Sequence, residues 1–224
     1  MSPRIERVDP REGYDRWAET YDATDNPVVG MDQRHALAAL TPREGERVLD
    51  AGCGTGRHLP GMVAAGCRVI GADFSGGMLA VARRRAPGVP LVRADLQRGL
   101  PFGAGVFDAA LCALVGEHLG DLDAAFAETV RVLAPGARFV FTVYAPEMAA
   151  AGIEANFESG GIEYRLGAER HTGADYVRAL EAAGFREVRL TAHRGDEALA
   201  RVVPSAQKYV GRPLLLVIEA GRSR

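Results

Sequence analysis

The stretch VLDAGCGTG, Val48–Gly56, decides the fold. Its apolar start is typical of a buried strand, three alternating glycines follow, and apolar residues at helical spacing begin at Leu59. This order predicts a strand, a tight turn and the N-terminus of a helix. Glycine suits such a turn because it accepts positive φ and lets a ligand approach bare backbone. The unpaired amides at the start of the helix favour an anion or the polar end of a ligand.

An acidic residue stands at the end of the next strand-like run. Asp73 follows Arg68–Ala72, roughly 20 residues after the glycine turn, and a carboxylate at this place can accept hydrogen bonds from both hydroxyls of a ribose. The glycine spacing is G-x-G-x-G, which differs from the G-x-G-x-x-G of dinucleotide-binding enzymes. The turn and the acid together indicate a ligand that contains adenosine.

Further motifs follow in a recognisable order. They are Ala72–Ser75 (ADFS), Ala94–Leu96 (ADL), Leu100–Phe102 (LPF) with Phe107-Asp108, and Arg131–Gly136 (RVLAPG). With VLDAGCGTG, they make residues 45–145 resemble the class I S-adenosylmethionine-dependent methyltransferases, close to the ubiquinone/menaquinone-type branch that acts on small molecules. The resemblance implies that S-adenosylmethionine is the cofactor and S-adenosylhomocysteine its product. It says almost nothing about the methyl acceptor.

Short apolar strands alternate with amphipathic helices between residues 47 and 144. This alternation predicts right-handed βαβ units and a parallel sheet with helices on both faces. We expect strands at 47–51, 68–73, 89–93, 106–113 and 137–144, and helices at 57–65, 76–86 and 121–133. Gly136 is the expected C′ residue of the last helix, and Ala137 replaces a second glycine that is usual in the family.

The remaining segments predict additions to this core. Residues 1–10 are expected to be disordered, and Tyr14, Trp17, Ala18 and Tyr21 recur at the spacing of a helix. A loop at 22–30 and a helix at 31–40 follow. After the core, a Gly-Gly turn between two short runs predicts a hairpin at 153–166. Further elements are a helix at 173–183, a strand at 185–191, a helix or loop at 195–209 and a strand at 213–220.

The expected fold class is therefore α/β. We predict a Rossmann-like, doubly wound, mostly parallel seven-stranded sheet with an antiparallel last strand and a small cap of helices and a hairpin. A single domain, 1–224, would comprise an N-terminal helical cap (11–40), a cofactor-binding core (45–145) and a cap insertion (146–172).

Composition narrows the possible functions. A formal net charge of −2 does not indicate a nucleic-acid-binding surface. The three cysteines fall at predicted core or turn positions, so disulfides are not expected, and no Cys or His cluster has metal-ligand spacing. No signal peptide or long apolar run is evident, which favours a cytoplasmic protein without membrane association.

The resemblance assigns the cofactor site to residues at the strand ends. Asp73 would hold the ribose, Asp95 would accept from the adenine amino group beside the Leu96 amide, and Asp50 would organise the turn. Phe74 and Met78 either wall the adenine or belong to the core, and Tyr21 either touches the methionine end or packs in its helix. The full set is Tyr21, Asp50, Ala51, Gly52, Cys53, Gly54, Asp73, Phe74, Met78, Asp95, Leu96 and Ala113.

The sequence offers three candidate bases, which are Glu117, His118 and His171. His118 follows the fourth strand and His171 precedes a predicted helix, but each also fits a structural role. The remaining candidates for contact with substrate are Tyr14, Trp17, Glu117, Glu163 and Tyr164.

The sequence thus predicts a methyltransferase that acts on a small-molecule acceptor through O, N or C. Two alternatives stay open: a non-methylating relative that binds the cofactor, of pericyclase-like or regulatory type, and a protein methyltransferase. Residues 146–172, with Tyr14–Tyr21, are expected to cover the cofactor site and to form most of the acceptor pocket. The alternative interpretation of the hairpin is an edge for oligomerisation, so the protein is expected to be a monomer or a homodimer.

Overall fold

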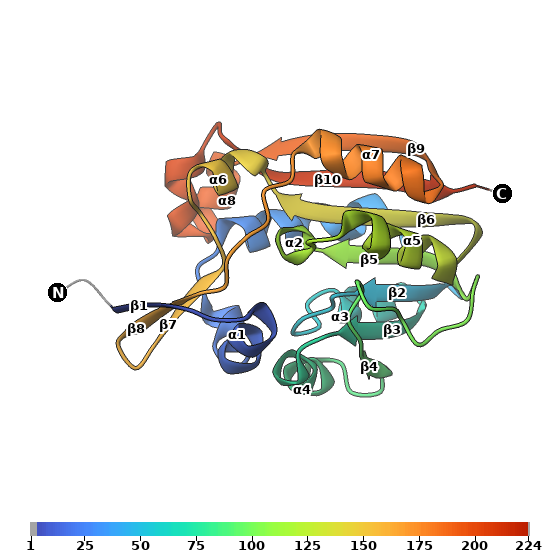
Figure 1. The fold of residues 1–224 in the computed structure, drawn as a ribbon, viewed down its shortest axis with the longest axis horizontal. Coiled ribbons are helices and arrows are strands. Elements are labelled where there is room, and N and C mark those ends of the chain that lie inside the picture. The colour runs from blue at the N-terminus through green and yellow to red at the C-terminus, as the bar shows by residue number, and fades with distance from the viewer. Residues whose placement is uncertain (1–3, 224) are drawn as a thin grey trace.

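The computed structural model describes residues 4–223 and contains a central seven-stranded sheet (Figure 1). The strand order is β4-β3-β2-β5-β6-β10-β9; the first five strands are mutually parallel, and β10 is antiparallel to both of its neighbours. The predicted topology is confirmed. The strands are β2 Arg47–Ala51, β3 Arg68–Asp73, β4 Leu91–Arg93, β5 Phe107–Ala113, β6 Leu133–Tyr144, β9 Phe185–Arg194 and β10 Pro213–Arg222.

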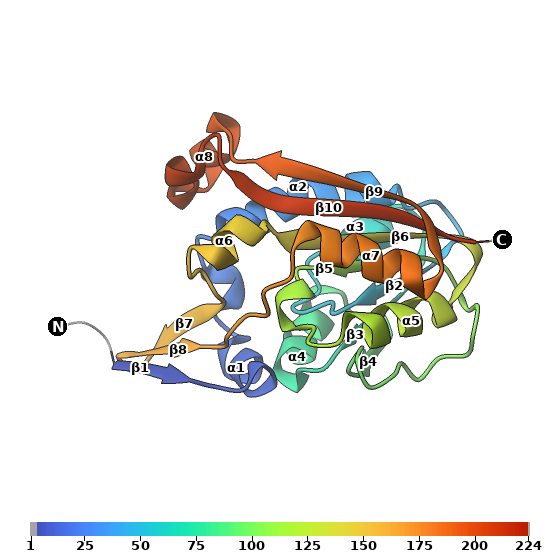
Figure 2. The same cartoon turned by 45° about the horizontal axis from the view of Figure 1, so that its top comes forward.

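Helices cover both faces of this sheet (Figures 1 and 2). On one face, α5 (Leu122–Val132) and α7 (Gly173–Ala183) bury a core that includes Phe126, Phe139 and Phe141. On the other face, α2 (Pro27–Leu40), α3 (Leu59–Ala64) and α4 (Gly76–Arg85) bury a second core. Helix α2 therefore packs directly on the central sheet. The prediction that residues up to 40 form a cap is wrong for this helix.

A second, three-stranded sheet lies beside α1 (Pro10–Trp17), at the end of the molecule opposite the C-terminus (Figure 2). It contains the hairpin β7 (Asn156–Ser159) and β8 (Ile162–Arg165), as predicted. Gly160 and Gly161 have φ of +59° and +76°, the positive values that a two-residue hairpin turn needs.

The third strand of this sheet is β1, Arg4–Arg7, which pairs in parallel with β8. The expectation of disorder at residues 1–10 is therefore wrong from Arg4 onward, and residues 1–3 lie outside the described part of the chain. Polar composition misled here because the pairing supplies backbone hydrogen bonds that do not depend on side-chain polarity. Trp17, Phe157 and Leu166 form a small buried core between this sheet and α1.

Two further boundaries differ from prediction. Helix α2 begins at Pro27, because Asn26 caps it by accepting from the amides of Val28 and Val29 and proline suits a first helical turn. The predicted loop at 22–30 is thus shorter and contains a 3-10 turn, η1, Tyr21–Ala23. Gly136 is not a C′ residue. It has φ of +79° and lies in the first part of β6.

The remaining elements are short. They are η2 Gly116–His118, α6 Pro146–Ala150, α8 Glu197–Val202 and η3 Pro204–Tyr209. The last two fill the region predicted as helix or loop. Among residues 4–223, no helix combines the length and apolarity needed to cross a membrane.

Candidate functional site

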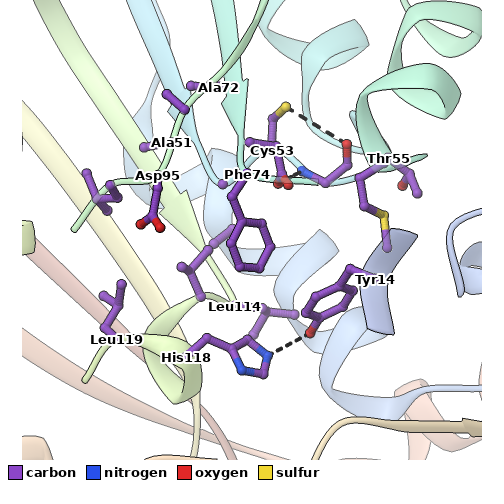
Figure 3. A pocket seen from close by; sticks show the side chains of 18 of the residues that line it. Tyr14, Ala51, Cys53, Thr55, Ala72, Phe74, Asp95, Leu114, His118 and Leu119 are labelled. Carbon is purple, nitrogen blue, oxygen red and sulfur yellow. Dashed lines mark hydrogen bonds between the residues drawn. The ribbon is translucent and has the colours of Figure 1, made fainter. Parts of the chain in front are cut away.

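A cavity of about 860 Å³, counted with its open mouth, lies at the carboxyl ends of β2, β3 and β5 (Figure 3). The strand order changes direction between β2 and β5, which is where ligands of doubly wound sheets bind. The predicted residues that line it are Tyr14, Tyr21, Ala51, Gly52, Cys53, Gly54, Asp73, Phe74, Met78, Asp95, Leu96, Ala113 and His118. The structure thus gathers residues from positions 14 to 118 around one space.

The glycine turn needs its glycines for two different reasons. Gly52 has φ of +78°, and a Cβ there would overlap Cγ2 of Val115. Its amide donates to the carbonyl of Ala72 at 2.7 Å, which fastens the turn to β3. Gly54 has φ of +53°, but a Cβ there would meet no atom of the described residues within 4 Å. Gly54 therefore leaves bare backbone beside open space.

Asp73 is held in place by backbone amides. Its two carboxylate oxygens accept from the amides of Gly54 and Ser75, each at 2.8 Å. Burial nevertheless raises the pKa of Asp73 to about 6, against the opposing effect of these hydrogen bonds. Each oxygen keeps a lone pair for a further donor, because a carboxylate has about four acceptor sites.

Asp50 lies at the end of β2 but does not line the cavity. It is 1% exposed, and neither carboxylate oxygen has a hydrogen-bond partner among residues 4–223. Burial raises the pKa of Asp50 to about 6, and the charges of His58 and Arg57 act in the opposite direction. This carboxyl is an unsatisfied polar group next to the glycine turn.

The far wall of the cavity combines one carboxylate with apolar groups. Asp95 accepts from the amide of Gln97 at 3.1 Å and pairs with the guanidinium of Arg11 at 3.2 Å. Arg11 in turn lies 5.6 Å from the centre of the Phe74 ring. Met78 is buried and lines the same space. Helix α1 thereby reaches over the end of the cavity.

His118 and Tyr14 are joined across the cavity by a hydrogen bond of 2.8 Å (Figure 3). Burial lowers the pKa of His118 to about 4 and raises that of Tyr14 well above its usual value. At neutral pH both groups are therefore uncharged, and the tautomer of His118 decides which of them donates. In either tautomer Nε2 is engaged by Tyr14, so His118 is suited to holding Tyr14 rather than to taking a proton from a substrate at this atom.

Three other predicted residues lie away from the cavity. His171 donates from Nε2 to the carbonyl of Leu119 at 2.7 Å, which fixes a loop. Glu163 pairs with Arg165, and Tyr164 stacks on Phe157 with ring centres 5.1 Å apart. None of the three lines this cavity or the neighbouring cavity lined by Trp17 and Glu117. Their geometry gives them structural contacts rather than contacts with a ligand.

A second cavity of about 830 Å³, also counted with its mouth, adjoins the first. Tyr14, Tyr21 and Leu114 line both, so these residues form a shared wall. Trp17 and Glu117 line the second cavity but not the first. The cap insertion contributes 148 and 153–156 to its lining.

Sequence reasoning missed several residues of the site. Arg57, directly after the glycine motif, lines the first cavity and binds Asp32 on α2 at 3.1 Å. Asp32 is 0% exposed and also accepts from His58 at 2.7 Å and Thr142 at 2.6 Å. The position of Arg57 directly after the glycine motif could have indicated its place in the site. No sequence pattern could have indicated Asp32, because its partners are distant in sequence.

Comparison with known proteins agrees with this geometry. Residues 49–141 match the family described as methyltransferase domain. A demethylmenaquinone methyltransferase of Beutenbergia cavernae is 39% identical over 57% of this chain and 54% of its own length. One of Corynebacterium kroppenstedtii is 29% identical over 86% of this chain and 82% of its own. The chain thus spans about half the length of the first of these relatives.

A solved structure extends the comparison. An S-adenosylmethionine-dependent methyltransferase from Mesorhizobium loti has a TM-score of 0.70 and 26% identity, over 87% of this chain and all of that one. With the glycine turn and the strand order, this match shows the fold of the class I S-adenosylmethionine-dependent methyltransferases, and residues 49–141 match the methyltransferase-domain family.

Proposed function

We propose that the protein transfers a methyl group from S-adenosylmethionine to a small-molecule acceptor. The observation that carries the proposal is the first cavity, where bare backbone at Gly54 and the carboxylates of Asp73 and Asp95 face one space at the strand ends. The relatives named demethylmenaquinone methyltransferase support a small acceptor. The second cavity shares a wall with the first, so an acceptor bound there would lie beside the cofactor.

The residues of the first cavity fit the parts of this cofactor. Asp73 would accept from the ribose hydroxyls, and Asp95 from the adenine amino group. Phe74 and Met78 would wall the adenine, and Tyr21 would approach the methionine end. The turn residues Ala51, Gly52, Cys53 and Gly54 would meet the cofactor through backbone. The bound cofactor supplies the activated methyl group, and the chain supplies positioning and exclusion of water.

The purified protein is expected to bind S-adenosylmethionine and S-adenosylhomocysteine with one site per chain. The reason is the set of backbone and carboxylate groups that face the first cavity. Titration calorimetry measures this directly, with NAD as a control that carries adenosine without the methionine part. Absence of heat with either sulfur compound at millimolar concentration would remove the proposed function.

Asp73→Ala is expected to weaken binding of S-adenosylhomocysteine by more than about 1 kcal/mol, because hydrogen bonds to a charged group contribute about 1.5–3 kcal/mol each. The Asp73 carboxylate also accepts from Gly54 and Ser75, so thermal unfolding must be followed in parallel. Asp73→Asn retains one acceptor oxygen and should fall between the two proteins. Equal affinity in all three would place the ribose contact elsewhere.

A further inference from the structure

Two buried polar groups of the second cavity lack partners. Glu117 is 7% exposed, and its Oε2 accepts no hydrogen bond from the described residues. Tyr144 is 9% exposed, and its hydroxyl also has no partner there. Both residues line the second cavity, from η2 and from the end of β6. Buried polar groups normally have partners, so this pair indicates a ligand that supplies them.

The lining around this pair favours a cation. It includes the aromatic rings of Tyr14, Trp17, Tyr21, Tyr144 and Tyr209, and no lysine, arginine or histidine among the described residues. Of its other carboxylates, Glu154 pairs with Arg7 at 3.3 Å, and Asp25 is exposed and accepts from the amide of Ser205 at 3.0 Å. Glu117 is the carboxylate of this lining that is both buried and without a partner at Oε2 among the described residues.

We propose that the second cavity binds a protonated organic amine through Glu117, Tyr144 and the aromatic wall, and that this amine is the methyl acceptor. The identity of the acceptor rests on the proposed function, whereas amine binding does not. Aromatic faces attract a cation, and a carboxylate excluded from water prefers a hydrogen-bonded positive partner. The Tyr144 hydroxyl can accept a second N–H of the same amine.

The position of Glu117 suits the chemistry that an amine requires. Glu117 and His118 are consecutive, yet Glu117 lines the second cavity and His118 the first. The nitrogen must lose a proton before it can attack, and the Glu117 carboxylate can take that proton and pass it to water. The nitrogen lone pair then forms the N–C bond as the methyl group leaves sulfur, which keeps the electron pair of the broken bond.

The protonation state of Glu117 provides a measurable signature. Burial raises the pKa of Glu117 to about 8, its own backbone hydrogen bond opposes this, and the charge of Asp32 adds to it. In the empty cavity at pH 7 the group is mostly the neutral acid, and a bound ammonium group would ionise it. The titratable groups that act on it or on which it acts are Tyr14, Tyr21, Asp32, Cys112, Tyr144 and Tyr176.

Calorimetry with phenethylamine and its neutral analogue 2-phenylethanol tests the proposal at pH 7, with and without saturating S-adenosylhomocysteine. We expect the amine to bind at least tenfold more tightly than the alcohol. In two buffers of different ionisation enthalpy, amine binding should release about one proton from Glu117. Glu117→Gln should lose 10- to 100-fold of amine affinity, as expected for a hydrogen bond between charged groups, and should release no proton.

Matched variants separate this outcome from a general effect. Glu181→Gln changes an exposed acid on α7 and should bind the amine as the wild type does. Tyr144→Phe should bind the amine more weakly than the wild type without a change in proton release. This variant provides the test if Glu117→Gln does not fold. Equal binding of alcohol and amine, or an unchanged Glu117→Gln variant, would overturn the inference. Failure of S-adenosylhomocysteine to bind would instead remove the proposed function and leave the amine site standing.

Discussion

Asp32→Ala is expected to lower the free energy of unfolding by about 3–5 kcal/mol. Asp32 is fully buried and receives hydrogen bonds from Arg57, His58 and Thr142. Removal of the carboxylate would leave the Arg57 guanidinium, itself 12% exposed, without its buried counter-charge. The same network links α2, the start of α3 and β6, so its loss loosens the support of the glycine turn.

Chemical denaturation at pH 7 measures this effect, and Arg34→Ala is the control. Arg34 lies on the same helix and pairs with Asp196 near the surface, so its loss should cost no more than about 1 kcal/mol. A loss from Asp32→Ala as small as that of the control would contradict the prediction.

The difference in free energy of unfolding between the wild type and Asp32→Ala should depend on pH. Burial opposes ionisation of Asp32, but the hydrogen bond and charge of His58, with the charge of Arg57, lower its pKa. A lowered folded-state pKa gives stability that is present above the unfolded value and lost as pH falls through the folded one. The difference between wild type and Asp32→Ala should therefore shrink below about pH 4.

Gly52→Ala is expected to lower the free energy of unfolding by about 2–4 kcal/mol. The left-handed backbone at Gly52 would strain any residue with a Cβ, and this Cβ would also overlap Val115. Gly54→Ala is the matched comparison, because its backbone is also left-handed but no atom of the described residues opposes its Cβ. The free energy of unfolding of Gly54→Ala should fall by only about 1–2 kcal/mol.

The two glycine variants should separate stability from binding. Gly54→Ala places a methyl group beside the first cavity, so we expect a larger loss of S-adenosylhomocysteine affinity than of stability. Gly52→Ala should lose mainly stability. Thermal unfolding and calorimetry on the same samples measure both, and equal destabilisation by the two substitutions would contradict the role given to Val115.

The parallel core was predictable because its signals are local. Each strand is a short apolar run, each helix has its own periodicity, and Asp73 and Asp95 follow strand ends in the chain. Strand ends of a parallel sheet meet at one edge, so these residues converge without any knowledge of long-range contacts. The cofactor-site predictions therefore include mostly residues that line the first cavity.

The positions that the sequence could not reveal depended on tertiary contacts. Glu163 and Tyr164 are consecutive on β8, and the packing of the small sheet on α1 decides that neither lines a cavity of the site. His171 stood next to a predicted helix, and its carbonyl partner lies 52 residues away. The buried partners of Asp32 come from α3 and β6, which no local pattern connects to α2.

The small sheet has a consequence for how the protein is made. Strand β1 is synthesised before β8, yet Arg4 pairs with Ile162, 158 positions later. At about 5–20 residues per second, β1 waits roughly 10–30 seconds for its partner. The first cavity takes its lining from residues no later than 119, whereas the second also needs 144–156 and Tyr209. All residues that line the first cavity are therefore synthesised before those that complete the lining of the second.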